Sequence, residues 1–149
     1  MIAITPFAVS DLLEMVLSPT AAREVSWHER RALAAVYAEA GNCFTARAED
    51  AEGAMRVIFC GGYVERHTQH ASLWAFYAGD IGLHGWAFLL RRARQLIDAM
   101  PHRRVDAAVR DGEAAAARWA ERCGLRLETT LGEAAPDGCD LLIYRRIEE

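Results

Sequence analysis

The sequence predicts an α+β fold of the α/β-sandwich type, in which helices cover both faces of a mixed, mostly antiparallel sheet. Three observations predict it: helix and strand patterns follow the order β-α-α-β-β-β-α-β-α-β-β, three strand patterns are consecutive, and helix and strand then alternate. A chain of 149 residues with 52% apolar residues can bury one core, so we expect a single domain over residues 1–149.

The first part of the chain contains a short strand and two helices. An apolar stretch at residues 2–5 predicts the strand, and Ser10 is a suitable N-cap for a short helix with apolar residues at helical spacing. Ser26 and Glu29 match a capping box, a pair whose side chains bond the first free backbone N–H groups of a helix. The second helix therefore begins near Ser26, and it ends at Gly41.

Three consecutive strands follow in the middle of the chain. Residues 43–48 alternate loosely, residues 54–63 form a stronger apolar run, and residues 71–78 are rich in aromatic side chains. The Glu52-Gly53 pair and the polar segment 65–70 are the expected turns between them. This order predicts an antiparallel meander.

The second half of the chain alternates between helix and strand. The expected elements are a helix over residues 83–100, a strand over 104–109, a helix that ends at Cys123, and strands over 125–131 and 140–147. Asp111 is the expected N-cap of the second of these helices, and Gly124 is its stop signal.

Composition and charge restrict the class of protein. The net charge of −4 and the pI near 5.7 disfavour nonspecific nucleic-acid binding by the whole chain. The four cysteines are scattered without a CxxC pair, which favours reduced thiols. Residues 1–7 show no basic segment followed by an apolar one, and the apolar runs are too short to span a bilayer. We therefore expect a soluble intracellular protein without a signal peptide, and no membrane or specific nucleic-acid partner.

The segment from residue 105 to residue 125 carries a family resemblance. A strand at residues 105–109 (VDAAV) leads into a helix that ends on Gly124 and Leu125. This resembles the strand–helix segment of the Gcn5-related N-acetyltransferase (GNAT) fold, and the order of elements matches that fold over essentially the whole chain. The resemblance implies a single GNAT-like domain that uses acetyl-CoA if it is catalytic.

A second resemblance concerns the long helix and the strand before it. The pattern is an aromatic strand, a short turn and then H-x-x-x-FLL/R-R-x-R-x-x-x-D. The residues that carry it are Trp74, His84, Phe88, Leu89, Leu90, Arg91, Arg94 and Asp98. The pattern is similar to that of acetyltransferase-like proteins from T7-like phages. This resemblance implies other phage proteins as partners and a location in the virion or the host cytoplasm.

The GNAT resemblance also places a cofactor loop between the aromatic strand and the long helix. Family members that use acetyl-CoA carry Q/R-x-x-G-x-G/A there, and backbone amides at the helix N-terminus hold the CoA pyrophosphate. The candidate cofactor-binding residues are Gly79, Ile81, Gly82, Leu83, His84 and Gly85. Gly82 fits the pattern, whereas Gly79 replaces the Gln or Arg and His84 replaces the small final residue. Asp80 adds a negative charge, so the sequence predicts a degenerate pyrophosphate loop or a plain strand-to-helix turn.

The resemblance implies two catalytic groups as well. A tyrosine four residues before the terminal glycine of the last helix acts as general acid, but counting back from Gly124 gives Ala120. A general base is expected on the central strands to deprotonate the amine. The candidates for this base are Glu65, His67 and Asp80.

Two other groups of side chains have competing interpretations. His67 and His70 could form half of a zinc site, but no further ligands follow at a suitable spacing, so we expect no metal. Arg91, Arg92 and Arg94 could dock an acidic partner or nucleic acid, although a solvated helix face is the default interpretation.

Two functions are compatible with these observations. We expect a phage GNAT-fold protein with a degenerate acetyl-CoA loop that acts as a virion or assembly-associated interaction or structural component. The alternative is an active acetyl-CoA-dependent N-acetyltransferase acting on a protein or small-molecule amine, because backbone amides supply most of the phosphate binding. A CoA-binding or nucleotide-binding module without catalysis and a homo-oligomer are also left open.

Overall fold

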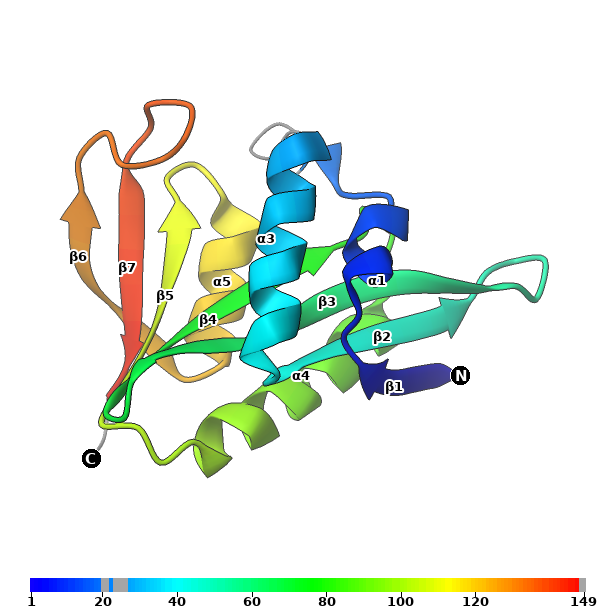
Figure 1. Cartoon of the computed structure of the whole chain (residues 1–149), viewed down its shortest axis with the longest axis horizontal. Helices are drawn as coiled ribbons and strands as arrows, with labels where there is room; N and C mark the ends of the chain where they lie inside the picture. The colour runs from blue at the N-terminus through cyan, green and yellow to red at the C-terminus, as the bar shows by residue number, and fades with distance from the viewer. Residues whose placement is uncertain (20–21, 23–26, 148–149) are drawn as a thin grey trace. The chain divides into compact units, whose positions relative to one another are not determined.

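The computed structural model describes residues 1–19, 22 and 27–147 (Figure 1). The elements in chain order are β1 (Ile2–Pro6), α1 (Val9–Glu14), α3 (Trp27–Ala40), β2 (Cys43–Glu49), β3 (Met55–His67), β4 (His70–Tyr77), α4 (Leu83–Ala99), β5 (Arg104–Arg110), α5 (Ala114–Arg122), β6 (Leu125–Leu131) and β7 (Leu141–Arg146). The strand order of the sheet is β1-β2-β3-β4-β5-β7-β6. β4 and β5 are parallel, whereas β1–β2, β2–β3, β5–β7 and β6–β7 are antiparallel. The predicted α+β class with a mixed, mostly antiparallel sheet is confirmed.

The chain divides into two compact units. The boundaries between them fall within β3, β4 and α4, so each unit contains a part of each of these elements. Unit 1 consists of Met1–Val64 and Trp74–Gly85, and unit 2 consists of Glu65–Leu73 and Trp86–Glu149. The candidate cofactor loop lies in unit 1. The single domain expected over residues 1–149 stays a prediction.

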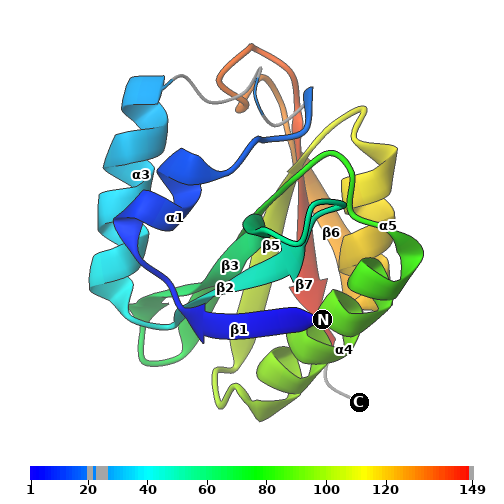
Figure 2. The same cartoon turned by 90° about the vertical axis from the view of Figure 1, so that its right-hand side faces the viewer.

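In unit 1, α1 and α3 lie side by side next to the strands (Figures 1 and 2). Their apolar side chains pack with those of the sheet in one buried cluster: Leu12, Met15, Leu17, Ala34, Val57, Cys60 and Ala78. Leu17 and Ala78 form an isolated antiparallel bridge, and the N–H of Ser18 donates to the carbonyl of Tyr77 at 3.2 Å. The segment after α1 therefore holds the end of β4, where the candidate loop begins.

A buried carboxylate attaches α1 to the sheet. Asp11 is 4% exposed, and it accepts hydrogen bonds from Thr45 Oγ1 at 2.7 Å and Arg47 Nη2 at 2.5 Å. Asp11 also accepts from the N–H of Ala8 at 2.9 Å. Ala8 is the N-cap of α1, so the predicted cap at Ser10 is wrong. The helix begins earlier because the Asp11 side chain reaches back to the free N–H group.

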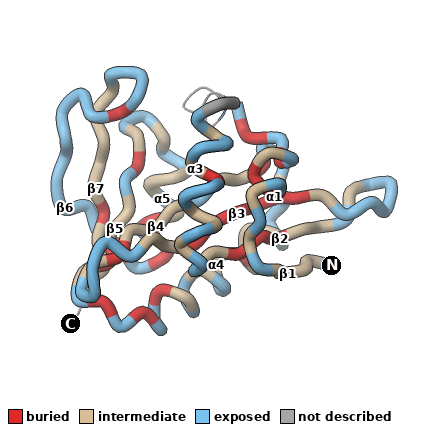
Figure 3. Tube along the Cα trace, in the orientation of Figure 1, coloured by how far each residue is buried: buried red, intermediate tan, exposed pale blue. Residues whose placement is uncertain are grey.

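Unit 2 has one apolar and one polar face of its strands. The apolar face lies under α5, where Val109, Ala120, Leu125 and Tyr144 form a buried cluster. Side chains alternate between the faces along each strand, so the polar residues next to these positions lie on the opposite face. β6 is the edge strand, and six of its seven residues are exposed (Figure 3).

Two predicted boundaries differ from the structure. The polar segment 65–70 is not a loop, because β3 continues to His67 and the turn is limited to residues 68–69. Its polar side chains find partners: Arg66 Nε donates to Ser72 Oγ at 3.1 Å. Asp111 is not the N-cap of α5, which is Glu113; Gly112, with φ +93°, separates the two. The capping box predicted at Ser26 lies outside the described residues.

Candidate functional site

The candidate cofactor loop joins β4 to α4 within unit 1. Residues 78–82 connect the two elements, and α4 begins at Leu83. Leu83 is 89% exposed, and His84 is also exposed. The first N–H groups of a helix lack intrahelical partners and carry a partial positive charge, so this terminus can attract an anion. The sequence places no acidic side chain in the first turn of α4 that would oppose this attraction.

The glycines of the loop differ in the space around them. A Cβ added at Gly82 would have no heavy atom within 4 Å, so the backbone there is open to a ligand. A Cβ at Gly85 would lie 2.8 Å from Ile81 Cγ2, so this glycine permits the close packing of the loop on the helix. At Gly79 the added atom would lie 3.6 Å from Ser18 Cα, an ordinary contact. Gly82 is therefore the least crowded of the three glycines of the loop.

The charge of Asp80 is offset by a neighbouring arginine. Arg56 Nη1 donates to Asp80 Oδ1 at 2.7 Å, and the Asp80 side chain is 73% exposed. The hydrogen bond from Arg56 lowers the pKa of Asp80 below its ordinary value. Asp80 is consequently a weaker base than an ordinary aspartate, and its repulsion of an anion is reduced. The sequence did not indicate this pair, because Arg56 lies on β3.

The other two candidate bases belong to unit 2. Glu65 forms a 3.0 Å hydrogen bond with His102 Nε2, and His102 is 3% exposed. His67 is exposed and accepts a hydrogen bond from the N–H of Gln69 at 3.1 Å. Glu65 and His67 therefore lie close to each other, near the end of β3. The assignment of the general base stays a prediction.

The position where the resemblance implies a tyrosine is filled by a small side chain. Ala120 is 4% exposed and packs in the core cluster under α5. The adjacent Trp119 contacts Trp86, with ring centroids 5.1 Å apart. An indole donates one hydrogen bond and has no proton to transfer near neutral pH. Neither residue can replace the general acid that the resemblance implies.

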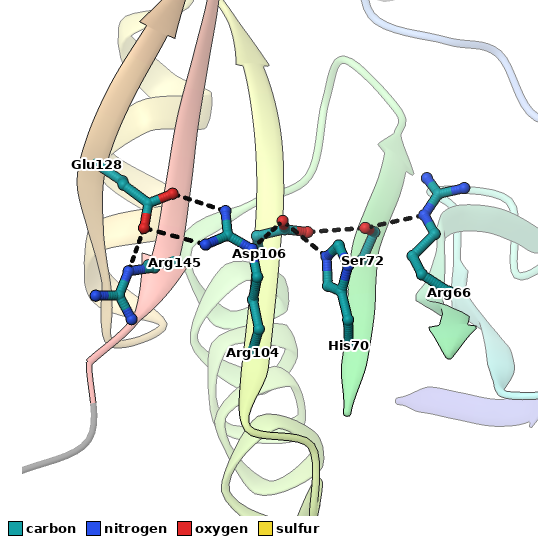
Figure 4. A network of polar contacts seen from close by, with 7 residues as sticks. All are labelled: Arg66, His70, Ser72, Arg104, Asp106, Glu128 and Arg145. Carbon is teal, nitrogen blue, oxygen red and sulfur yellow. Dashed lines mark hydrogen bonds and ion pairs between the residues drawn. The ribbon is translucent and has the colours of Figure 1, made fainter. Parts of the chain in front are cut away.

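A polar network that is not among the sequence-based predictions crosses the open face of unit 2 (Figure 4). Asp106 accepts from Ser72 Oγ at 2.8 Å and from Arg104 Nε at 2.9 Å, and its Oδ2 lies 2.9 Å from His70 Nε2. Arg104 Nη1 and Nη2 also donate to Glu128, at 3.1 and 2.7 Å. Glu128 forms a further ion pair with Arg145. Arg66 Nε of β3 donates to Ser72 Oγ at 3.1 Å, so the network connects residues of five strands.

The network keeps Asp106 ionised. Burial raises the pKa of Asp106, but the hydrogen bonds from Ser72, Arg104 and His70 outweigh burial, so the pKa lies below its ordinary value. A carboxylate whose oxygens already accept several hydrogen bonds is a poor general base. The sequence offered one signal for this network: polar residues alternate with apolar ones at positions 70 and 72 and at 104 and 106.

Two features that would indicate other classes of protein are absent from the described residues. Among these residues, no group of three or more His, Cys, Asp or Glu side chains could hold a metal ion. The rings of His67 and His70 contact each other edge to face, with centroids 5.6 Å apart. In the same part of the chain, no helix is long and apolar enough to cross a membrane.

The strand order and the loop define the architecture. A mixed seven-stranded sheet with a parallel β4–β5 pair, whose β4 leads through a glycine-containing loop into α4, is the GNAT acetyltransferase fold.

Solved structures that resemble the chain share this fold. A candidate phosphinothricin N-acetyltransferase matches with a TM-score of 0.74 and 19% identity, over 100% of both chains. Ard1 from Thermoplasma volcanium matches with a TM-score of 0.72 and 14% identity, over 99% of this chain and 98% of that one. A GNAT-family acetyltransferase from Bacillus anthracis matches with a TM-score of 0.69 and 13% identity, over 98% and 94%. At such low identity the likeness shows the fold alone.

No protein-family model matches the chain, and no curated protein matches it by sequence.

Proposed function

We propose that the chain is an acetyl-CoA-dependent N-acetyltransferase that acts on an amine of a protein or of a small molecule. The observation that carries this proposal is the open backbone at Gly82, directly before α4, in a chain with the GNAT fold. The structural neighbours described as acetyltransferases support the proposal.

The cofactor would be held mainly by the main chain. The residues that would hold its pyrophosphate are Gly79, Ile81, Gly82, Leu83, His84 and Gly85. Free N–H groups at the start of α4 bind an anion whatever the side chains are. Arg56 supports binding because it pairs with Asp80 at 2.7 Å and so reduces the negative charge beside the loop. Bound acetyl-CoA supplies the acetyl group as a thioester.

The acceptor amine must lose a proton when it attacks the thioester, which requires a general base. Glu65, His67 and Asp80 are the proposed candidates. Asp80 is the least suitable of the three candidates, because the hydrogen bond from Arg56 lowers its pKa. Glu65 is held in place by the buried His102 at 3.0 Å.

Release of CoA thiol in the presence of amine acceptors tests the proposal. Gly82→Trp fills the open backbone with an indole, so we expect it to abolish thiol release while the chain stays folded. Ala51→Trp is the matched control, because it adds the same indole to the exposed turn between β2 and β3 and should leave activity unchanged. If Gly82→Trp keeps the activity of the wild type, the assigned loop is wrong.

A feature of the composition simplifies the assay with protein acceptors. All 17 residues in the Lys and Arg class are arginine, so the chain contains no lysine. Any acetyl-lysine detected after the reaction therefore belongs to the acceptor.

A second candidate function is a phage virion or assembly component with a degenerate loop. It is favoured by the buried Ala120 at the position where the resemblance implies a tyrosine. This function predicts a stable complex with other phage proteins and no acetyl-CoA turnover. Absence of the chain from purified phage particles would contradict this second function.

A further inference from the structure

Two arginines lie directly opposite each other on the last two strands of unit 2. Arg126 of β6 is the cross-strand partner of Arg145 of β7. Directly opposed residues of an antiparallel pair share one face of the sheet, with their Cβ atoms about 5 Å apart. Like charges in this arrangement repel each other. The two guanidinium groups therefore create a positive site that an anion bound to both of them would neutralise.

The chain itself neutralises only part of this charge. Glu128 accepts hydrogen bonds from Arg104 Nη1 and Nη2, at 3.1 and 2.7 Å, and Arg145 pairs with the same carboxylate through Nε (Figure 4). Within the part of the chain that the structure describes, Arg126 has no hydrogen bond or ion pair, and the Nη groups of Arg145 have no acceptor. Arg126 is exposed, and the Arg145 side chain is 39% exposed. Both arginines can therefore donate to an anion from solvent.

A groove adjoins Arg126 on β6. Its volume is about 490 Å³, and its lining residues are Glu121, Gly124, Leu125, Arg126, Leu127 and Ile147. Leu127 and Ile147 are 55% and 38% exposed, so the groove presents apolar side chains to solvent beside the arginine. Sites for small molecules have volumes of about 300–1,000 Å³. Because the carboxylate of Glu121 repels an anion, the anionic group of a ligand is expected at Arg126 and its apolar part along the groove.

We propose that Arg126 and Arg145 bind the carboxylate or phosphate group of a small organic anion, whose apolar part lies in the groove against Leu127 and Ile147. A guanidinium group can donate two parallel hydrogen bonds to either anion. The apolar part is stabilised because it removes the two exposed side chains from water. This inference goes beyond the proposed acetyltransferase activity and does not rest on it, since all of its residues lie in unit 2 and outside the candidate cofactor loop.

Titration of the full-length chain with hexanoate and with hexyl phosphate tests the proposal. The backbone amide NMR signals of residues 124–127 and 147 report on binding in the groove. We expect these signals to shift and saturate with at least one of the two probes, and the stronger probe identifies the preferred anionic group. Hexanol, which lacks the charge, and inorganic phosphate, which lacks the apolar part, should each bind about ten-fold more weakly.

A variant of Arg126 separates a role in binding from a role in the fold. Arg126→Gln should weaken binding of the stronger probe about ten-fold, because it removes the charge-assisted hydrogen bonds. It should leave the midpoint of thermal unfolding unchanged or raise it, because it removes the repulsion with Arg145. Arg118→Gln is the matched control: it removes the same charge from an exposed position of α5 outside the groove, so binding should equal that of the wild type.

Four results would overturn the proposal. One is the absence of saturable shifts with both probes, and another is binding of hexanol or inorganic phosphate as tight as that of the stronger probe. The third is equal binding by Arg126→Gln and Arg118→Gln. The last is a lower unfolding midpoint for Arg126→Gln, which would give this arginine a structural role in place of a ligand.

Discussion

Asp11 in unit 1 and Asp106 in unit 2 build similar networks in different surroundings. Each carboxylate accepts hydrogen bonds from a hydroxyl group and an arginine: Thr45 and Arg47 for Asp11, Ser72 and Arg104 for Asp106. The Asp11 side chain is 5% exposed, whereas that of Asp106 is 14% exposed and lies on a face that carries further exposed charges. The first network joins a helix to a sheet, and the second joins neighbouring strands.

Because the partners are alike, we expect burial, and not the type of partner, to decide how much each network contributes to the free energy of unfolding. Removing one member of a buried pair leaves a charge and its hydrogen-bond partners without compensation, which is costly. Solvent replaces the lost contacts when the pair is exposed. The Arg56–Asp80 pair at the candidate loop is more exposed than either network. We therefore expect it to affect the charge near the ligand and not the stability of the fold.

The largest effect on stability is expected at Asp11. Asp11→Ala leaves the buried Thr45 hydroxyl and the Arg47 guanidinium without their acceptor, so we expect the free energy of unfolding to fall by about 3 kcal/mol. Urea denaturation measures this change. The control is Ser10→Ala, an exposed position in the same helix, which should stay within about 0.5 kcal/mol of the wild type. A loss at Asp11 no larger than that of the control would contradict the comparison.

A smaller effect is expected at Asp106. Asp106→Asn keeps the shape but removes the charge that Arg104 and His70 contact, so we expect a loss of about 1–2 kcal/mol. The pKa of Asp106 is lower in the folded chain than its ordinary value. A lowered pKa stabilises the fold above the unfolded-state value of about 3.9 and loses that contribution as the pH falls below it.

The pH dependence of unfolding provides the check on Asp106. The difference between the wild type and Asp106→Asn should be constant near neutral pH and should close below about pH 4. Asp98→Asn, at an exposed position of α4, should show no such difference. A difference that persists well below pH 4 would mean that Asp106 is not stabilised as the carboxylate.

The smallest effect on stability is expected at Arg56. Arg56→Ala should leave unfolding unchanged, because the pair with Asp80 is exposed. It should weaken acetyl-CoA binding several-fold, since the charge of Asp80 is then no longer offset. The double variant Arg56→Ala with Asp80→Asn should recover most of the binding. If Arg56→Ala and the wild type bind acetyl-CoA equally well, the Arg56–Asp80 pair does not contribute to the candidate site.

Much of the fold could be predicted from local patterns in the sequence. Strand patterns at residues 43–48 and 71–78 and helix signals around residues 83–100 gave the right elements, because each signal lies within the element itself. Gly41 and Gly124 have φ values of +79° and +92°, so their conformation is one that glycine adopts easily. Such local preferences can be recognised without the tertiary structure.

The features that local sequence patterns do not predict depend on contacts between different elements. The capping of α1 by Asp11 involves Thr45 and Arg47 on β2, and the network around Asp106 involves strands whose register no local pattern gives. The composition of the polar end of β3 predicts a turn, because its partners, such as Ser72 and His102, lie outside that stretch of the strand. The loop itself could be located, whereas the pairing of Asp80 with Arg56 could not.

Calorimetric titration of acetyl-CoA into the full-length chain at low salt tests the central proposal most directly. We expect binding at about micromolar strength, near −8 kcal/mol, that is lost in Gly82→Trp and kept in Ala51→Trp. Absence of heat from the wild type at high protein concentration would contradict the proposal that the loop before α4 holds acetyl-CoA.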